Sequence, residues 1–259
     1  MAESPRSKAR RKRRAWLERL GLLLLAALLV FSATPTGQWA WQRLYTLSGF
    51  RGPAEEAPLE LHFIDVGKAD AILLQCQGKT ALLDAGTWAS GSRVVDYLHR
   101  MGVERLDYII ASHPDSDHIG GMAQVLEEIP AESLVIYPWP EEMCQSEEFR
   151  QLEEAAFSKQ VPVLEVEAGD ELPFGETYLQ ILGPLKVYEE TNDCSLVVRL
   201  EYEGFSALFC GDIENAAELD LVKSEVDLDA DLLKVAHHGS AGSSSERFLE
   251  AVSPAYAVI

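Results

Sequence analysis

Cysteine is scarce in this chain of 259 residues, and no metal ribbon can be built from what is there. The four cysteines are Cys76, Cys144, Cys194 and Cys210, and none belongs to a Cys-x-x-Cys pair, which argues against a structural zinc ribbon. Cys76 and Cys210 stand in apolar runs, so we interpret both as small buried hydrophobic residues. A disulfide among the four remains an alternative.

Positive charge is scarce outside the first 51 residues, which hold ten Lys and Arg and only two Asp and Glu. The remaining residues hold 12 basic and 40 acidic side chains, a net charge of −28. An acidic body of this size repels polyanions, so we expect no stable nucleic-acid binding from it. It does not exclude an enzyme that contacts phosphate through metal ions, because bound cations dominate the local field.

The N-terminal residues 1–34 form a segment of their own. A basic stretch from Arg6 to Arg14 precedes a charge-free and largely apolar run from Leu20 to Ala33. The pattern predicts an uncleaved signal anchor, which we favour, or a cleaved signal peptide. In both cases the basic flank stays in the cytoplasm, which predicts either a single-pass membrane protein with an extracellular C-terminal domain or a secreted protein. Residues 35–58 are a predicted linker.

Residues 59–259 alternate apolar runs with helical patterns, which indicates a layered α/β or α+β domain. Strands are predicted at 59–66, 71–76, 80–83, 106–111, 134–137, 161–166, 178–182, 195–202, 206–210, 231–236 and 255–259, and helices at 92–101, 121–128, 147–159 and after Asn215 and Ser243. Because the sequence stops within the last predicted strand, we expect the C-terminal part of the domain to be missing from it.

One segment carries an unusual density of metal-capable side chains: Ser112-His113-Pro114-Asp115-Ser116-Asp117-His118-Ile119-Gly120-Gly121. An apolar strand precedes it and a helical pattern follows it, so the strand end and the loop can turn these side chains toward one point. Asp and His in loops are also common as solvated turn residues. That alternative is weakened because further metal-capable side chains follow later strands.

Metal-capable side chains recur at the ends of the predicted strands. They are Asp84, His113, Asp115, Asp117, His118, Asp212, His237 and His238. Taken singly, each has a structural alternative as a turn or helix-cap residue. Taken together, they predict a site for two divalent cations bridged by a carboxylate. The two remaining histidines, His62 and His99, fit no site and are predicted to be structural.

These motifs resemble those of the metallo-β-lactamase superfamily, which has a four-layer αββα fold. The resemblance covers about residues 59–259 and rests on Phe63-Ile64-Asp65-Val66-Gly67, Leu82-Leu83-Asp84-Ala85-Gly86, the His113–Gly121 run, Gly211-Asp212 and Ala236-His237-His238-Gly239-Ser240. More narrowly, the chain resembles the branch containing the extracellular domain of ComEC-type DNA-uptake competence proteins. Marks of that branch are Asp115 in place of a second histidine, the strand entry at 192–197 and the double histidine.

The resemblance implies a role for each motif residue. His113 and Asp115 would bind one metal, Asp117 and His118 the other, and Asp212 would bridge them. One of His237 and His238 would complete the second site, and the other would lie near the substrate phosphate. Asp84 would orient a metal ligand from behind. Asp117 and His238 are also the predicted catalytic residues, and Asp117 would orient the attacking water.

The sequence departs from the family pattern in ways that affect these roles. The third histidine of the usual first metal site is absent, and Asn192 or Asp193 occupies its region, so we expect the first metal to be held weakly. Asn192 is a candidate for orienting the site. Lys68 replaces the usual glutamine of a Gly-Gln-Gly-Asp turn and is either a phosphate contact or a neutral change. Ser240, beside the double histidine, is a second candidate substrate contact.

Two divalent metal ions are the expected cofactors, with zinc as the family default and manganese favoured by the extra carboxylates. We predict a hydrolase in which metal-activated water attacks a phosphodiester, in DNA or in a smaller molecule. One alternative is a cell-wall phosphorylcholine-type esterase, which suits the acidic body better than long DNA. Another is a non-catalytic accessory module of DNA uptake that has lost a metal. A β-lactamase is disfavoured because those enzymes usually keep more histidine at the first metal.

Overall fold

The structure is a computed structural model that describes Trp16, Phe31, Thr34 and residues 57–259. The chain divides into two compact units, Met1–Glu55 and Glu56–Ile259. The predicted signal anchor or signal peptide and nearly all of the predicted linker lie outside the described residues. Within the described part of the chain, no helix combines the length and the apolar character needed to cross a membrane.

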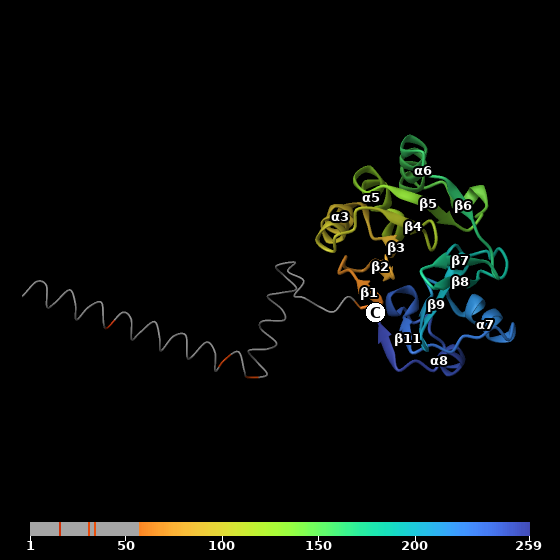
Figure 1. Ribbon diagram of the computed structural model, residues 1–259. Helices are drawn as coiled ribbons and strands as arrows, with labels where there is room; N and C mark the ends of the chain where they lie inside the picture. The colour runs from red at the N-terminus through yellow and green to blue at the C-terminus, as the bar shows by residue number, and fades with distance from the viewer. Residues whose placement is uncertain (1–15, 17–30, 32–33, 35–56) are drawn as a thin grey trace, which may run out of the picture. The chain divides into compact units, whose positions relative to one another are not determined.

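The first half of the domain forms a mixed six-stranded sheet with its strands in sequence order (Figure 1). Its strands are β1 (Leu59–Phe63), β2 (Ala71–Cys76), β3 (Lys79–Ala85), β4 (Leu106–Ile110), β5 (Ala131–Ile136) and β6 (Val163–Glu165). Strands β1 to β3 pair antiparallel, and β3 to β6 pair parallel. Parallel pairing needs a crossover between strands, and helices supply each of these connections.

The second half forms another six-stranded sheet on the same plan, antiparallel first and parallel afterwards. Its strands are β7 (Glu171–Phe174), β8 (Thr177–Gly183), β9 (Val197–Tyr202), β10 (Phe205–Phe209), β11 (Leu232–Lys234) and β12 (Tyr256–Val258). Strands β7 to β10 pair antiparallel, and β10 to β12 pair parallel. In both halves, therefore, the parallel strands point their carboxyl ends toward one edge of their sheet.

Helices cover the outer faces of the two sheets, which gives the four layers αββα (Figure 1). Helices α3 (Gly91–Arg100), α5 (Met122–Glu128) and α6 (Glu147–Lys159) lie over the first sheet, and α7 (Asn215–Lys223) and α8 (Glu246–Val252) over the second. Helix α3 buries Val94, Val95 and Leu98, the face that its helical spacing predicts. Between the sheets, the rings of Phe63 and Phe209 lie 6.4 Å apart.

The predicted helices and all of the predicted strands are present, with boundaries shifted by a few residues. Strand β7 was not predicted, because it is short and contains Pro173. The strand predicted at 231–236 is too long: β11 ends at Lys234, and Ala236–Gly239 forms a 3-10 turn instead. That turn carries the double histidine, so this correction bears directly on the site.

Two adjacent glycines let the metal-motif loop lie against the end of β3. A Cβ on Gly121 would lie 2.2 Å from the carbonyl oxygen of Ala85, and one on Gly120 would lie 2.6 Å from the backbone nitrogen of Trp88. The amide of Gly121 donates to the carbonyl of Gly86 at 3.0 Å. Any side chain at these positions would separate the short helix α4 (Ser116–Ile119) from β3.

Candidate metal centre

The predicted ligands meet where four parallel-paired strands end. Asp84 is the next-to-last residue of β3, and the His113–His118 segment follows β4. Asp212 follows β10, and His238 follows β11. The carboxyl ends of neighbouring parallel strands share one edge of a sheet, which is where layered α/β proteins build their sites. Each sheet therefore supplies part of one cluster.

Four of the side chains form what we call the compact half-site: Asp117, His118, Asp212 and His238. His118 Nε2 lies 3.2 Å from Asp212 Oδ1, and His238 Nε2 lies 3.4 Å from Asp117 Oδ2 and 3.5 Å from Asp212 Oδ2. A tetrahedral ion with bonds of 2.0–2.1 Å separates its ligand atoms by about 3.4 Å. Each of the three measured separations is therefore close to the distance between two ligand atoms of one such ion, and Asp117, His118 and His238 bring one ligand atom each within 4.8 Å of one another.

A second group, the open half-site, consists of His113 and Asp115 and shares Asp212. The nearest approach of His113 Nε2 to Asp115 Oδ2 is 3.8 Å, and the side chain of Asp115 is 46% exposed, whereas that of His113 is fully buried. His113, His118 and Asp212 still bring one ligand atom each within 4.8 Å of one another. The open half-site thus has fewer and wider-spaced ligands than the compact one.

The residues expected to replace the missing third histidine are engaged elsewhere. Asp193 Oδ1 accepts hydrogen bonds from the backbone amides of Glu214 and Ala217, at 2.8 and 3.2 Å, at the start of α7. Asn192 Nδ2 donates to Glu214 Oε1 at 3.3 Å. Asn192 therefore reaches the centre only through Glu214, and Asp193 has a helix-capping role.

Buried atoms without hydrogen bonds test whether the cluster fits a metal. Among the described residues, no hydrogen-bond partner exists for Nε2 of His113, His118 and His238 or for Oδ1 of Asp212. A buried polar atom left in this way costs about 1–3 kcal/mol, so four at one point need an explanation. Divalent cations accept lone pairs from atoms of these kinds. The residues of the two half-sites therefore fit metal ions.

Asp84 lies behind His118, as its predicted role requires. Its Oδ2 is 2.8 Å from His118 Nδ1, and its two oxygens accept hydrogen bonds from the amide and the hydroxyl of Ser112, at 2.8 and 2.6 Å. Asp84 has a positive φ of 58°. A carboxylate on Nδ1 leaves Nε2 of His118 facing the cluster as the ligand atom.

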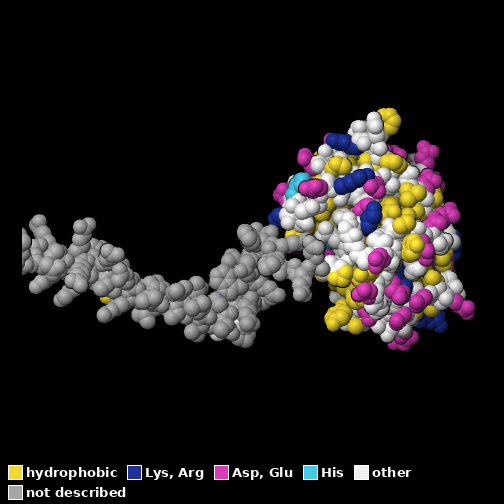
Figure 2. Space-filling view, in the orientation of Figure 1, with side chains coloured by type: hydrophobic (Ala, Val, Ile, Leu, Met, Phe, Trp, Pro, Cys, Tyr) yellow, Lys and Arg dark blue, Asp and Glu magenta, His cyan; other side chains and the backbone are white. Residues whose placement is uncertain are grey.

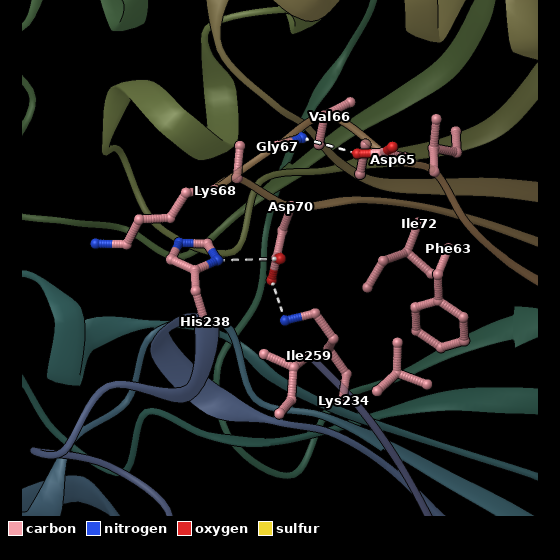
Figure 3. A pocket seen from close by; sticks show the side chains of 14 residues that line it. Phe63, Asp65, Val66, Gly67, Lys68, Asp70, Ile72, Lys234, His238 and Ile259 are labelled. Atoms are coloured by element: carbon pink, nitrogen blue, oxygen red, sulfur yellow. Dashed lines mark hydrogen bonds and ion pairs between the residues drawn. The ribbon is translucent and has the colours of Figure 1, made fainter.

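Asp70 is a site residue that we did not predict. It lies behind His238, with Oδ1 3.3 Å from Nδ1 of the imidazole and Oδ2 2.8 Å from Nζ of Lys234, as the dashed lines in Figure 3 show. Asp70 and Lys234 are both about 5% exposed. The available signal was its place at the end of Gly67-Lys68-Ala69-Asp70, which keeps the aspartate of the family's Gly-Gln-Gly-Asp turn.

The structure distinguishes the two adjacent histidines. His238 lies in the compact half-site and its side chain is 7% exposed, whereas that of His237 is 23% exposed and places Nδ1 3.0 Å from Glu214 Oε1. Both have positive φ angles, 50° and 51°. Such a conformation costs about 1–2 kcal/mol per residue and persists where surrounding contacts enforce it. We therefore assign His238 to the compact half-site and His237 to its rim.

The carboxylates set the charge of the histidines in the metal-free protein. The carboxylates of Asp117 and Asp70, which lie 3.4 and 3.3 Å from the two ring nitrogens, raise the pKa of His238 to about 9. Burial opposes protonation of His118, but Asp84 and Asp212 outweigh it and hold its pKa well above the usual value. Burial lowers the pKa of His113 well below its usual value. Protonated imidazoles thus occupy the compact half-site until a metal displaces their protons.

The predicted substrate contacts lie beside the centre. Lys68 is exposed and lines a cavity of about 430 Å³ together with Asp70, Lys234 and His238 (Figure 3). The amide of Ser240 donates to the carbonyl of His237 at 2.8 Å. On the face seen in Figure 2, acidic side chains are widely spread and basic ones are few. Lys68 is therefore one of the few cations of an acidic domain, and it lines the same cavity as His238 of the metal centre.

Two facing sheets with outer helices, and His and Asp ligands at their strand ends, define a metal-binding domain of the αββα class. The chain belongs to the metallo-β-lactamase superfamily, whose family model matches residues 64–259. The predicted fold class and the predicted family resemblance are both confirmed.

Curated relatives extend the resemblance to competence proteins. The chain is 30% identical to ComE operon protein 3 of Bacillus subtilis (strain 168), over 77% of this chain and 28% of that protein. It is 32% identical to competence protein ComA of Neisseria gonorrhoeae, over 92% of this chain and 33% of that protein. The chain thus spans about a third or less of the length of these relatives.

Among solved structures, the MIM-2 metallo-β-lactamase has a TM-score of 0.52 and 18% sequence identity, covering 74% of this chain and 83% of that one. At this identity the likeness concerns the fold alone.

Proposed function

We propose that the domain is a metal-dependent phosphodiesterase that uses activated water. The observation that carries the proposal is the convergence of unpaired ligand atoms on the compact half-site, within a fold whose family is rich in metal-dependent hydrolases. The two half-sites hold three carboxylates (Asp115, Asp117 and Asp212) beside three imidazoles (His113, His118 and His238), and this share of carboxylate favours hard ions and oxygen-rich substrates. Zinc is the first candidate and manganese the second.

Bound divalent ions would supply Lewis acidity to a phosphoryl oxygen and lower the pKa of the attacking water. Residues of the chain would orient the water and bind the substrate. The imidazole of His238, 3.4 Å away, lowers the pKa of Asp117, so its carboxylate is ionised and suited to orient that water. The side chain of Asp117 is 33% exposed, which gives solvent a route to it. His237 and Lys68, on the rim, would donate to the substrate's phosphate oxygens.

We propose that the substrate is a single-stranded or small phosphodiester. The acidic domain supports this choice, because each phosphate of a long nucleic acid contacts Lys or Arg in proteins that bind it tightly. The names of the competence relatives support DNA as one source of the substrate. We further propose that the domain acts outside the cytoplasmic membrane, on the strength of the basic and apolar N-terminal sequence.

Two other functions have support from particular observations. The sparse ligands of the open half-site favour a non-catalytic accessory module that binds at most one metal. The negative charge of the domain favours an esterase acting on a choline-bearing wall polymer, since a choline headgroup is cationic. Metal stoichiometry separates the first alternative from the enzyme, and substrate choice separates the second.

The test uses the full chain, loaded with zinc or manganese, and measures metal content together with hydrolysis of three probes. The probes are bis-p-nitrophenyl phosphate, a single-stranded oligonucleotide and p-nitrophenyl phosphorylcholine. Asp117→Ala removes the ligand that orients the water, and Asp96→Ala on the exposed face of α3 is the matched control.

We expect turnover of the first two probes that Asp117→Ala abolishes and Asp96→Ala leaves unchanged. No turnover above that of Asp117→Ala on any probe would reject the enzyme. Turnover of the phosphorylcholine ester alone would support the wall-polymer esterase.

A further inference from the structure

Lys234 is the only lysine that is buried among the described residues, with 4% of its surface exposed. Taking an ammonium group out of water costs several kcal/mol, which an ion pair offsets only when its geometry is good. Lys234 Nζ lies 2.8 Å from Asp70 Oδ2 and donates to the carbonyl of Val235 at 3.0 Å. An apolar residue of the same length could fill this place, but it could not make the contacts of the ammonium group with Asp70 and Val235.

Asp70 uses every polar group that it has: its backbone is bound within the first half of the domain, and its carboxylate reaches the second half. Its amide donates to the carbonyl of Asp117 at 3.3 Å, and its carbonyl accepts from the amide of Gly86 at 2.7 Å. Both of these partners belong to loops of the first sheet. Its carboxylate contacts Lys234 of β11 and His238 beyond β11, which belong to the second half. Asp70 is thus a fixed bridge across the metal centre.

We propose that Lys234 is a positioning residue, whose ammonium holds the Asp70 carboxylate on Nδ1 of His238 and keeps it out of the metal's own ligand set. The proposal rests on the metal binding that the proposed function requires, but not on phosphodiester hydrolysis. Figure 3 shows the carboxylate of Asp70 joined by one dashed line to the ammonium of Lys234 and by another to the imidazole of His238. Nε2 of that imidazole faces Asp117 and Asp212.

The need for a cation follows from how close Asp70 lies to the ligands. One oxygen of Asp70 comes within 4.8 Å of the ligand atoms of Asp212 and His238, so the carboxylate is placed to bind the metal itself. With Lys234 on one oxygen and His238 on the other, both are occupied. Asp84 serves His118 in the same way, but it is held by neutral donors from Ser112.

The test replaces the ammonium while keeping the length of the side chain, as Lys234→Met, and restores it as Lys234→Arg. Zinc affinity is measured by competition with a chromophoric chelator, and the visible spectrum of the cobalt(II) protein reports the number and geometry of ligands. Lys79→Met removes the ammonium of another lysine–aspartate pair, that with Asp107 on the first sheet. Leu233→Ala destabilises β11 without removing a charge, because Leu233 is fully buried.

We expect Lys234→Met to weaken zinc binding about 10–100-fold and to change the cobalt spectrum, as loss of an outer partner of a metal ligand does. Lys234→Arg should restore the affinity to within a few-fold. Lys79→Met and Leu233→Ala should keep the parent's cobalt spectrum. A Lys234→Met protein that binds zinc as the parent does, with an unchanged spectrum, would overturn the proposal, and so would a parent chain that binds no metal.

A second variant covers the case in which Lys234→Met does not fold. Lys234→Met combined with Asp70→Asn removes both buried charges, and Asp70→Asn alone is its partner. The double variant is compared with Asp70→Asn, and we expect the two to bind zinc within a few-fold of each other, because both changes break one line of contacts. A double variant that binds zinc tenfold or more weakly than Asp70→Asn would contradict the proposal. Zinc binding that responds in this way in a chain without hydrolytic activity would reject the phosphodiesterase and keep the role of Lys234.

Discussion

The compact and open half-sites share Asp212 but differ in what lies behind their ligands. In the compact half-site, Asp84 contacts Nδ1 of His118 and Asp70 contacts Nδ1 of His238. In the open half-site, Nδ1 of His113 meets only the hydroxyl of Ser112, at 3.1 Å, among the described residues. Carboxylates behind imidazoles fix the ring and raise its basicity as a ligand. The difference teaches that two neighbouring metal positions can have very different affinities.

The largest loss of metal binding and of hydrolysis is expected from a change at Asp212, the residue that the two half-sites share. Asp212→Ala removes the shared carboxylate, so both positions should lose metal and hydrolysis of bis-p-nitrophenyl phosphate should fall about 10³-fold or more, since the ions supply several kcal/mol of stabilisation. Metal analysis after gel filtration and steady-state kinetics measure the two losses. His99→Ala, on the exposed face of α3, is the control. Retention of one tightly bound metal would mean that the half-sites do not share Asp212.

The next effect separates the half-sites by proton release. The pKa of His238, raised to about 9, requires zinc to displace a proton, whereas burial keeps His113 neutral. Zinc affinity of the compact half-site should therefore rise about tenfold per pH unit for each proton displaced, which is about 10²-fold between pH 6 and 8 for the proton of His238 alone. Calorimetric titration in buffers of different ionisation enthalpy counts the protons. Binding without proton uptake by the buffer would contradict the assignment of His238.

The same shift has a consequence for the stability of the metal-free protein. The pKa of folded His238 lies above that of an unfolded histidine, near 6.5, so its protonation stabilises the fold below pH 6.5. That contribution, of order 2 kcal/mol, is lost as the pH rises toward 9. Urea unfolding of chelator-treated protein at pH 6 and 9, with His238→Gln beside it, measures the difference. The variant should show the smaller loss.

A third prediction concerns the partner of a single ligand. Asp84→Asn removes the carboxylate behind His118, and we expect zinc affinity of the compact half-site to fall about 10–100-fold. The open half-site should lose less, because Asp84 contacts His118 directly and reaches His113 only through the hydroxyl of Ser112. Stepwise chelation followed by metal analysis resolves the two positions. An equal loss at both would remove the distinction between them.

The smallest effect repairs the open half-site. Asp115→His restores the imidazole that the family usually has there, and we expect zinc at this position to bind about tenfold more tightly, because imidazole suits zinc better than carboxylate does. The side chain of Asp115 is 46% exposed, so the change is tolerated sterically. Equilibrium dialysis at limiting zinc gives the second binding constant. Asp115→Asn, of nearly unchanged size, is the matched control and should weaken this position.

Spacing and strand ends predict that the candidate ligands come together, because His113, Asp117 and His118 follow one strand closely and Asp212 follows another. The sequence does not reveal which of two adjacent histidines turns inward, since that depends on the left-handed backbone of both. Nor does it predict the joint role of Asp70 and Lys234, which approach each other only when the two sheets pack face to face. Contacts within one loop can be predicted from the local sequence, whereas contacts between the two halves can be seen only once the fold is known.

The compact half-site draws its ligands from Asp117 to His238, on both sheets. During synthesis the first sheet leaves the ribosome long before the second, and domains fold as the chain emerges. A growing chain that ends before residue 238 therefore carries a metal motif that lacks its last ligand. We therefore expect a metal to bind this cluster only after the second sheet has docked on the first.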